Sequence, residues 1–94
     1  MKVSILVPAY NERNTIEEVL ARLKAVPLEK EIIVVDDGSS DGTREFLGGV
    51  KEQEVRVILH PENLGKGAAI RTGLAQATGE VVIIQDADLE YMPE

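Results

Sequence analysis

The sequence predicts an α/β fold with a parallel, Rossmann-like sheet and flanking helices. Short runs of valine, isoleucine and leucine alternate along the chain with segments whose apolar residues recur at helical spacing. Polar loops containing glycine or proline separate these segments. An alternation of strands and helices requires right-handed crossovers, and these produce a parallel sheet. We expect four strands in the spatial order 3-2-1-4.

The first half of the chain supplies two strands and two helices. Val3 to Val7 is a nearly continuous apolar run, which is typical of a strand buried on both faces. We expect the next helix to begin near Asn14, with Glu17 completing a capping box three residues later. Glu31 to Val35 predicts the second buried strand, and Thr43 to Leu47 predicts a short helix after it.

The second half repeats the pattern. Val55 to Leu59 predicts the third strand, and Val81 to Ile84 predicts the fourth. Between them, the loop at 63–67 opens a third helix, and Gly79 is expected just past the end of that helix. The residues expected on the buried face of this helix are Ala69, Ile70, Gly73, Leu74 and Ala77.

Composition restricts the class of partner. The chain of 94 residues is 44% hydrophobic and 29% charged, as in a soluble globular protein. Its net charge of −7 argues against nucleic acid as a partner, because nucleic-acid binding depends on lysine and arginine. The absence of cysteine excludes disulfides and thiolate metal sites. No apolar run resembles a signal peptide or a membrane span, so we expect a cytoplasmic location.

The informative polar clusters lie directly after strands. Pro8 to Glu12 follows the first strand, Asp36 to Gly42 the second, and Asp86 to Glu90 the fourth. In open α/β sheets, ligands bind beyond the carboxyl ends of the strands, where the strand order reverses. The predicted strand order therefore brings these clusters together at one crevice.

Asp86 and Asp88 carry the clearest chemistry. Residues two apart in extended backbone point to the same side, so these carboxylates can address one ion, with Glu90 joining them. Oxygen ligands of this kind suit Mg²⁺ or Mn²⁺ that is also held by phosphate oxygens and water. A solvated acidic turn is the alternative, and the apolar strand that precedes the pair argues against it.

Other polar residues have two interpretations. One of Asp36 and Asp37 is expected only to shape a turn, and the other to accept a hydrogen bond from a base or ribose. Lys66 either offsets diphosphate charge at a helix start or is a surface lysine at a glycine turn. The glycine spacing matches neither a phosphate-binding loop nor a dinucleotide fingerprint. His60 precedes Pro61 in an expected turn and has no paired serine.

Four ordered motifs resemble family 2 glycosyltransferases, especially the branch that transfers sugars to dolichyl or polyprenyl phosphate. They are VPAYNE at 7–12, VVDDGSSDGT at 34–43, NLGKG at 63–67 and QDADLE at 85–90. The resemblance covers the whole chain and implies the N-terminal, nucleotide-binding half of a GT-A fold. It also implies a UDP- or GDP-linked sugar as donor, and a lipid phosphate or glycan as acceptor.

The same resemblance implies roles for individual residues. A base and ribose pocket would be lined by Pro8, Tyr10, Glu12 and Asp37. The metal that carries the donor diphosphate would be bound by Asp86, Asp88 and Glu90, and would stabilise the leaving diphosphate as a Lewis acid.

The chain departs from the family in length. Family members continue beyond the acidic motif with an acceptor site and a catalytic base, and many add membrane helices, which implies association with the cytoplasmic face of a membrane. We therefore expect the 94 residues to be one part of a transferase domain, without transfer activity of their own. We also expect homo-oligomers through the open edge of the fourth strand.

Three other classes compete with a transferase. A stand-alone module could bind nucleotide and metal and transfer nothing. A phosphoacceptor domain would place one aspartate after a central strand and a lysine after a later one, which fits the motifs poorly. A nucleotidyltransferase would open with a glycine-rich loop after the first strand, where this chain has Pro8 to Glu12.

Overall fold

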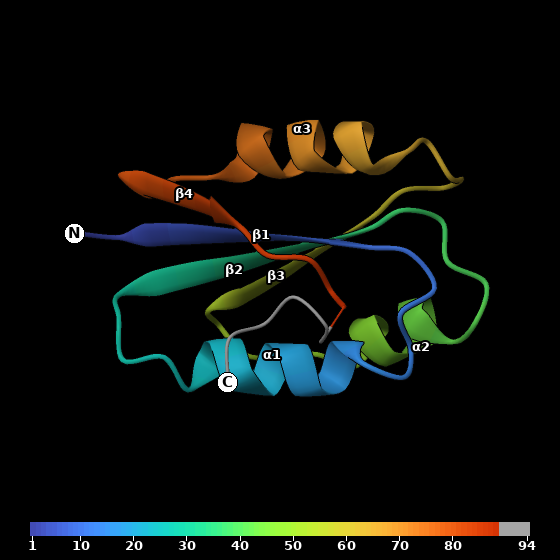
Figure 1. The fold of residues 1–94 in the computed structure, drawn as a ribbon, viewed down its shortest axis with the longest axis horizontal. Coiled ribbons are helices and arrows are strands. Elements are labelled where there is room, and N and C mark those ends of the chain that lie inside the picture. Colours follow the sequence, from blue (N-terminus) through green and yellow to red (C-terminus); the bar gives the residue numbers. More distant parts are fainter. Residues whose placement is uncertain (89–94) are drawn as a thin grey trace.

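The sheet contains four parallel strands (Figure 1). The computed structural model describes residues 1–88 of the chain. The strands are β1 (Val3–Ala9), β2 (Lys30–Asp36), β3 (Val55–Leu59) and β4 (Val81–Ile84). Their order, β3-β2-β1-β4, confirms the order predicted from the alternation of elements.

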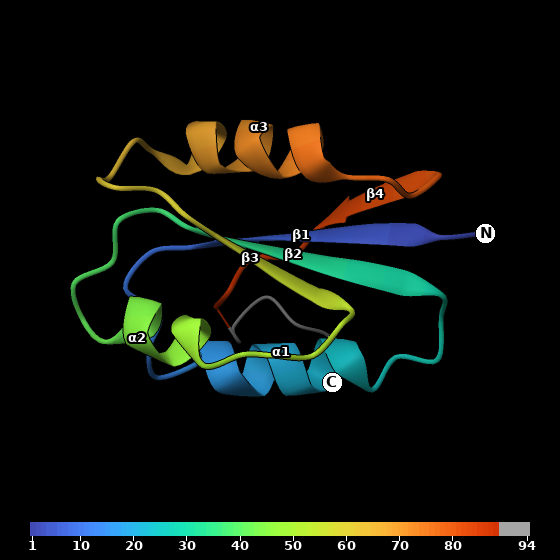
Figure 2. The same cartoon turned by 180° about the vertical axis from the view of Figure 1, so that it is seen from behind.

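Helices cover both faces of the two central strands. They are α1 (Ile16–Lys24), α2 (Thr43–Gly48) and α3 (Lys66–Gln76). Figures 1 and 2 show α1 and α2 on one face of the sheet and α3 on the other. Successive side chains of β1 alternate between these layers, so Ile5 packs in the cluster that contains α1 while Leu6 packs with Ala69 of α3. Gly73 allows the close approach of α3, because a Cβ there would lie 3.2 Å from Leu6 Cδ2.

The carboxyl ends of three strands are level. Ala9, the last residue of β1, pairs with Asp36, the last residue of β2, and Asp36 pairs with Leu59 at the end of β3. The backbone N–H of Asp37 then donates to the Ala9 carbonyl, and that of His60 donates to the Asp36 carbonyl, each at 2.8 Å. The loops that leave these strands therefore begin side by side at one edge of the sheet.

The start of α1 corrects one expectation. A capping box formed by Asn14 and Glu17 is wrong, because the helix begins at Ile16 with Thr15 as its N-cap and has no side-chain cap hydrogen bond. The Thr15 hydroxyl instead donates to the backbone carbonyl of Ala87, at 2.6 Å. A tertiary contact to the loop after β4 has therefore replaced the local cap.

The end of α3 corrects another. The helix ends at Gln76, and Ala77 is its C-cap in extended backbone. The prediction that Gly79 directly follows the end of the helix is therefore wrong. A Cβ at Gly79 would lie 2.7 Å from the Ser4 backbone nitrogen, and the Gly79 N–H donates to Ser4 Oγ at 2.8 Å. This glycine is therefore required by close contact with β1.

β4 is an edge strand among the described residues, and its four side chains are 40–48% exposed. The α3 helix packs on β1 and β2, which leaves β4 without comparable cover. Leu74 is 48% exposed, so its predicted place on the buried face of α3 is wrong, whereas Ala69 and Gly73 are buried as expected. The open edge predicted for β4 is present, and association through it stays a prediction. Within residues 1–88 no helix is long and apolar enough to cross a membrane.

Candidate functional site

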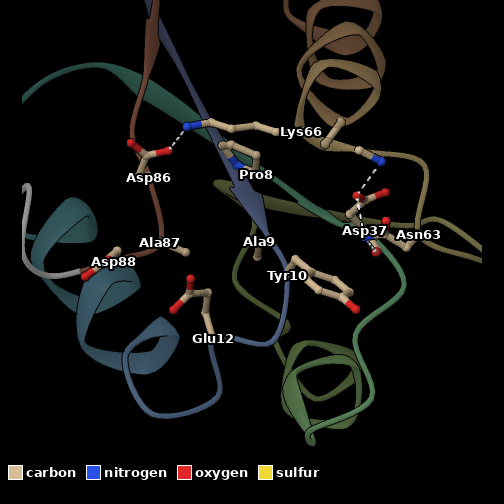
Figure 3. Close-up of a pocket in the computed structure, with 12 residues that line it drawn as sticks. Pro8, Ala9, Tyr10, Glu12, Asp37, Asn63, Lys66, Asp86, Ala87 and Asp88 are labelled. Carbon is tan, nitrogen blue, oxygen red and sulfur yellow. Dashed lines mark hydrogen bonds and ion pairs between the residues drawn. The ribbon is translucent and has the colours of Figure 1, made fainter.

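A pocket of about 470 Å³ lies beyond the carboxyl ends of β1, β2 and β4. Its walls come from the loops that follow all four strands and from the first turns of α3 (Figure 3). The crevice predicted at the reversal of strand order is therefore present. The lining residues are Pro8, Ala9, Tyr10, Glu12, Asp37, Asn63, Gly65, Lys66, Ala69, Asp86, Ala87 and Asp88.

The loop after β1 contributes Tyr10, whose side chain is 48% exposed. Two hydrogen bonds fix this loop to the loop after β2. The Asn11 N–H donates to Ser39 Oγ, and the Ser40 N–H donates to Asn11 Oδ1, both at 2.8 Å. Asn11 has a φ of 52°, a left-handed conformation that asparagine tolerates better than most residues. The turn thus presents an accessible aromatic ring at the pocket wall.

Glu12 lies on the same side of the pocket, close to the start of α1. Its backbone N–H donates to Thr43 Oγ1 at 3.1 Å, which connects it to the first residue of α2. Its carboxylate lies 3.2 Å from the oxygen of the Thr15 hydroxyl, which makes its shorter contact, of 2.6 Å, to the Ala87 carbonyl. Pro8, Tyr10 and Glu12 therefore come from one short segment that is held by the loop after β2 and by the first residue of α2.

Asp37 lines the pocket with a carboxylate that is almost fully hydrogen-bonded. Oδ1 accepts from His60 Nδ1 and from the Leu64 N–H, both at 2.9 Å. Oδ2 accepts from Asn63 Nδ2 at 3.0 Å and from the Gly65 N–H at 2.8 Å. A carboxylate has about four acceptor positions. Asp37 therefore organises the loop that leads into α3, in addition to facing the pocket.

The environment keeps Asp37 ionised. Burial of this residue, which is 3% exposed, acts to raise its pKa. The hydrogen bonds from His60, Leu64 and Gly65 outweigh burial and hold the pKa below its usual range. A permanent negative charge therefore lies at this side of the pocket at neutral pH.

His60 is the residue that sequence reasoning missed. Its Nδ1 contacts Asp37, and its Nε2 lies 2.8 Å from the Thr72 hydroxyl of α3. The neutral tautomer with a proton on Nδ1 satisfies both contacts, since Nε2 then accepts from Thr72. A single histidine before a proline carries no periodic signal of burial. Its position directly after β3, at the same end of the sheet as Asp37, was the signal that could have placed it near the site.

Asp36 has the structural role predicted for one member of the aspartate pair. It is completely buried, and its Oδ2 accepts from the Ser39 N–H at 3.1 Å and lies 3.8 Å from an Arg44 nitrogen. Its Oδ1 is buried and has no hydrogen-bond partner among the described residues. Asp36 shapes the loop after β2 and does not line the pocket.

An ion pair spans the pocket between α3 and the loop after β4. Lys66 is the first residue of α3, and its Nζ lies 2.5 Å from Asp86 Oδ1 (Figure 3). Both side chains are accessible, with 59% of Lys66 and 36% of Asp86 exposed. The sequence allows two interpretations of Lys66, either as a lysine that offsets diphosphate charge or as a surface lysine at a turn. Its position beside an acidic residue of the pocket favours the first interpretation.

The two aspartates of the acidic motif both line the pocket, but they point to different parts of it. Figure 3 shows Asp86 turned toward Lys66, with Asp88 on the side of Glu12. Ala87 between them is 2% exposed, which anchors the loop. Glu90, the third predicted ligand, lies outside the described residues. Within residues 1–88 no three histidine, cysteine, aspartate or glutamate side chains are grouped to hold a metal ion.

The donor set nevertheless fits a divalent ion that is held in part by a bound ligand. Mg²⁺ and Mn²⁺ take oxygen ligands and commonly bind one or two carboxylates, with phosphate oxygens and water completing the shell. Asp86 and Asp88 offer such carboxylates in an open pocket. The Lys66 ammonium on Asp86 also shows that this carboxylate accepts a cation as partner.

Comparison with known proteins gives a family match over residues 4–94, to the model described as glycosyl transferase family 2. A dolichol-phosphate mannosyltransferase of Pyrococcus furiosus is 40% identical over all of this chain and 28% of its own length. A mannosyltransferase of Pyrobaculum calidifontis, solved with GDP-Man and Mn²⁺, is 36% identical with a TM-score of 0.81, over 92% of this chain and 27% of that one. TarS 1-349 of S. aureus, solved with UDP, is 34% identical with a TM-score of 0.84, over 94% of this chain and 28% of that one. The chain thus spans under a third of the length of these relatives.

Proposed function

The chain belongs to glycosyl transferase family 2, and we propose that it forms the donor-binding part of a glycosyltransferase, where it holds a nucleotide-diphosphate sugar through a divalent metal ion. One observation carries the proposal. A single pocket beyond the carboxyl ends of the strands has an exposed aromatic ring from the loop after β1 in one part and, in another, the lysine that begins α3 paired with a carboxylate from the loop after β4. A nucleoside diphosphate has the same division, with a flat base at one end and an anionic diphosphate at the other.

The nucleoside side of the pocket is formed by Pro8, Tyr10, Glu12 and Asp37. The Tyr10 ring offers a face for stacking on a base, and the Glu12 carboxylate can accept a hydrogen bond from a ribose hydroxyl or a base N–H. Asp37 contributes negative charge and fixes the wall behind the nucleoside. Its own acceptor positions are used by the loop before α3, so a nucleoside would share a position already in use.

The diphosphate side is formed by Asp86, Asp88 and Lys66. Two carboxylates would repel a diphosphate, on a chain that already has a net charge of −7. Mg²⁺ or Mn²⁺ held by Asp86 and Asp88 would reverse that repulsion and supply Lewis-acid stabilisation of the leaving diphosphate. Glu90 follows Asp88 closely enough in sequence to join them. The proposal is supported by the Mn²⁺ in the similar mannosyltransferase of P. calidifontis.

The acceptor we propose for the whole protein is a lipid phosphate, as the name of the similar dolichol-phosphate mannosyltransferase suggests. Such an acceptor would place the protein at the cytoplasmic face of a membrane. UDP and GDP remain equal candidates for the nucleotide, because the similar structures include one with GDP-Man and one with UDP. We assign the catalytic base to no residue of this chain.

Calorimetry with UDP and GDP tests the proposal. Each nucleotide is titrated in buffer with Mn²⁺ and again in buffer with EDTA. We expect one of them to bind in Mn²⁺ and to lose most of its affinity in EDTA. Equal affinity in the two buffers would exclude the metal bridge, and no binding of either nucleotide would exclude the proposed donor site.

A further inference from the structure

We propose that Lys66 competes with the divalent ion for Asp86: it pairs with that carboxylate in the metal-free pocket, and moves to the donor diphosphate when metal and nucleotide bind. The inference rests on the proposed function and adds a residue-level exchange to it. Lys66 would thus be a cation of the protein itself that pairs either with the Asp86 carboxylate or with the donor diphosphate.

The geometry of the ion pair carries the first half of the inference. Lys66 Nζ lies 2.5 Å from Asp86 Oδ1, so the ammonium occupies the position in front of the oxygen that would bind a metal. An ammonium and a divalent cation on the same carboxylate oxygen would repel each other, so a metal ion that binds Asp86 there would displace Lys66. Because 59% of Lys66 and 36% of Asp86 is exposed, the pair is weak and can open without unfolding the loop.

The position of Lys66 in its helix carries the second half. The N-terminus of a helix is the positive end of its dipole, so a lysine there is electrostatically unfavourable and an acidic residue is preferred. The first turn of α3 nevertheless has no acidic residue and begins with Lys66. The positive end of the helix and the Lys66 ammonium together are favourable where an anion binds. The long, flexible lysine side chain can reach a diphosphate in the same pocket once Asp86 has released it.

Two binding measurements on the full chain test the exchange. Mn²⁺ affinity is measured by electron paramagnetic resonance without nucleotide, and UDP and GDP affinity by calorimetry in saturating Mn²⁺. We expect Lys66→Met to raise the Mn²⁺ affinity by about 2- to 5-fold, because an exposed competing ion pair is lost. The same variant should lower the affinity for the nucleotide diphosphate by about 10-fold, because a charge-assisted contact is lost.

Lys51→Met is the matched control. Lys51 is exposed, precedes β3 at the opposite end of the sheet and does not line the pocket, yet its substitution changes the net charge equally. It should leave both affinities unchanged within about 1.5-fold, because distant exposed charges are screened by salt. Lys66→Arg retains the positive charge and should show smaller changes than Lys66→Met in both measurements.

The opposite signs of the two effects distinguish exchange from a structural role. If Lys66→Met weakens both Mn²⁺ and nucleotide, or leaves either affinity at the level of the Lys51→Met control, the inference is wrong while the proposed function stands. If the unmodified chain binds neither Mn²⁺ nor nucleotide, the proposed function fails, and the exchange fails with it.

Discussion

Asp37 Oδ1 lies 2.9 Å from His60 Nδ1, and this hydrogen bond joins the loops that follow β2 and β3. The His60 ring continues to the Thr72 hydroxyl on α3, at 2.8 Å. A buried aspartate, a buried histidine and a helix are therefore connected directly behind the pocket. The connection sets the position of the loop that precedes Lys66.

Substitution of His60 tests this connection. His60→Ala should lower the free energy of unfolding by about 1–3 kcal/mol, because Asp37 and Thr72 both lose a buried partner. His60→Asn can keep the donor to Asp37 while losing the contact to Thr72, and should cost less. Denaturant unfolding of both variants checks the order. An alanine variant as stable as the unmodified protein would show that the ring contributes nothing to the stability of this loop.

The lowered pKa of Glu31 predicts that the fold loses stability in acid, for a reason that does not involve the pocket. Glu31 accepts hydrogen bonds from Ser4 Oγ and the Thr78 N–H, both at 2.6 Å, at the opposite end of the sheet. Burial acts to raise its pKa, but these bonds and the Lys2 charge lower the pKa from 4.5 to about 2. A lowered folded-state pKa stabilises the fold above the unfolded value, and this contribution is lost as the pH falls from 4.5 through about 2.

The measurement is the free energy of unfolding between pH 6 and pH 2, for the unmodified chain and for Glu31→Gln. We expect the difference between them to be at most about 3 kcal/mol at pH 6 and to vanish near pH 2. Asp37 and Asp41 also have lowered pKa values and add acid sensitivity to both proteins, so the difference isolates Glu31. A difference that does not change with pH would contradict the assigned pKa.

Asp88→Ala should remove the metal dependence of nucleotide binding while the fold stays intact. The residue lies in the loop after β4 and lines the pocket, outside the apolar core. Affinity for UDP or GDP in Mn²⁺ should fall to the level measured in EDTA. Glu45→Ala, an exposed substitution on α2 away from the pocket, is the control for the loss of one negative charge. Retention of full Mn²⁺-dependent affinity by Asp88→Ala would remove this residue from the site.

The edge of β4 is uncovered among residues 1–88, and this predicts self-association of the chain. The four apolar side chains of β4 are 40–48% exposed, and an uncovered strand edge favours pairing with another chain. Light scattering should show a mass that rises with concentration, and Ile83→Lys should return the chain to a monomer. A monomer at all concentrations of the unmodified chain would contradict the prediction.

The sequence predicted the strand order and the convergence of the three polar clusters, because both follow from local periodicity and from general rules of parallel sheets. It did not reveal that Asp37 is shared between the pocket and the α3 loop, since that depends on contacts between residues far apart in the chain. Leu74 fits a buried helical face by spacing, yet its exposure depends on which strands α3 covers. The start of α1 was misplaced for a similar reason, because Thr15 bonds to Ala87 across the fold.

Nuclear magnetic resonance with substoichiometric Mn²⁺ and nucleotide tests the central claim most directly, because paramagnetic broadening reports which amides lie near the ion. We predict that the signals of Asp86, Ala87 and Asp88 broaden first, followed by those at 64–67, and that UDP or GDP strengthens the effect. The signals of Glu31 and Thr78, at the other end of the sheet, should stay sharp. Equal broadening at both ends of the sheet, or none at 86–88, would contradict a metal-bridged donor site in this pocket.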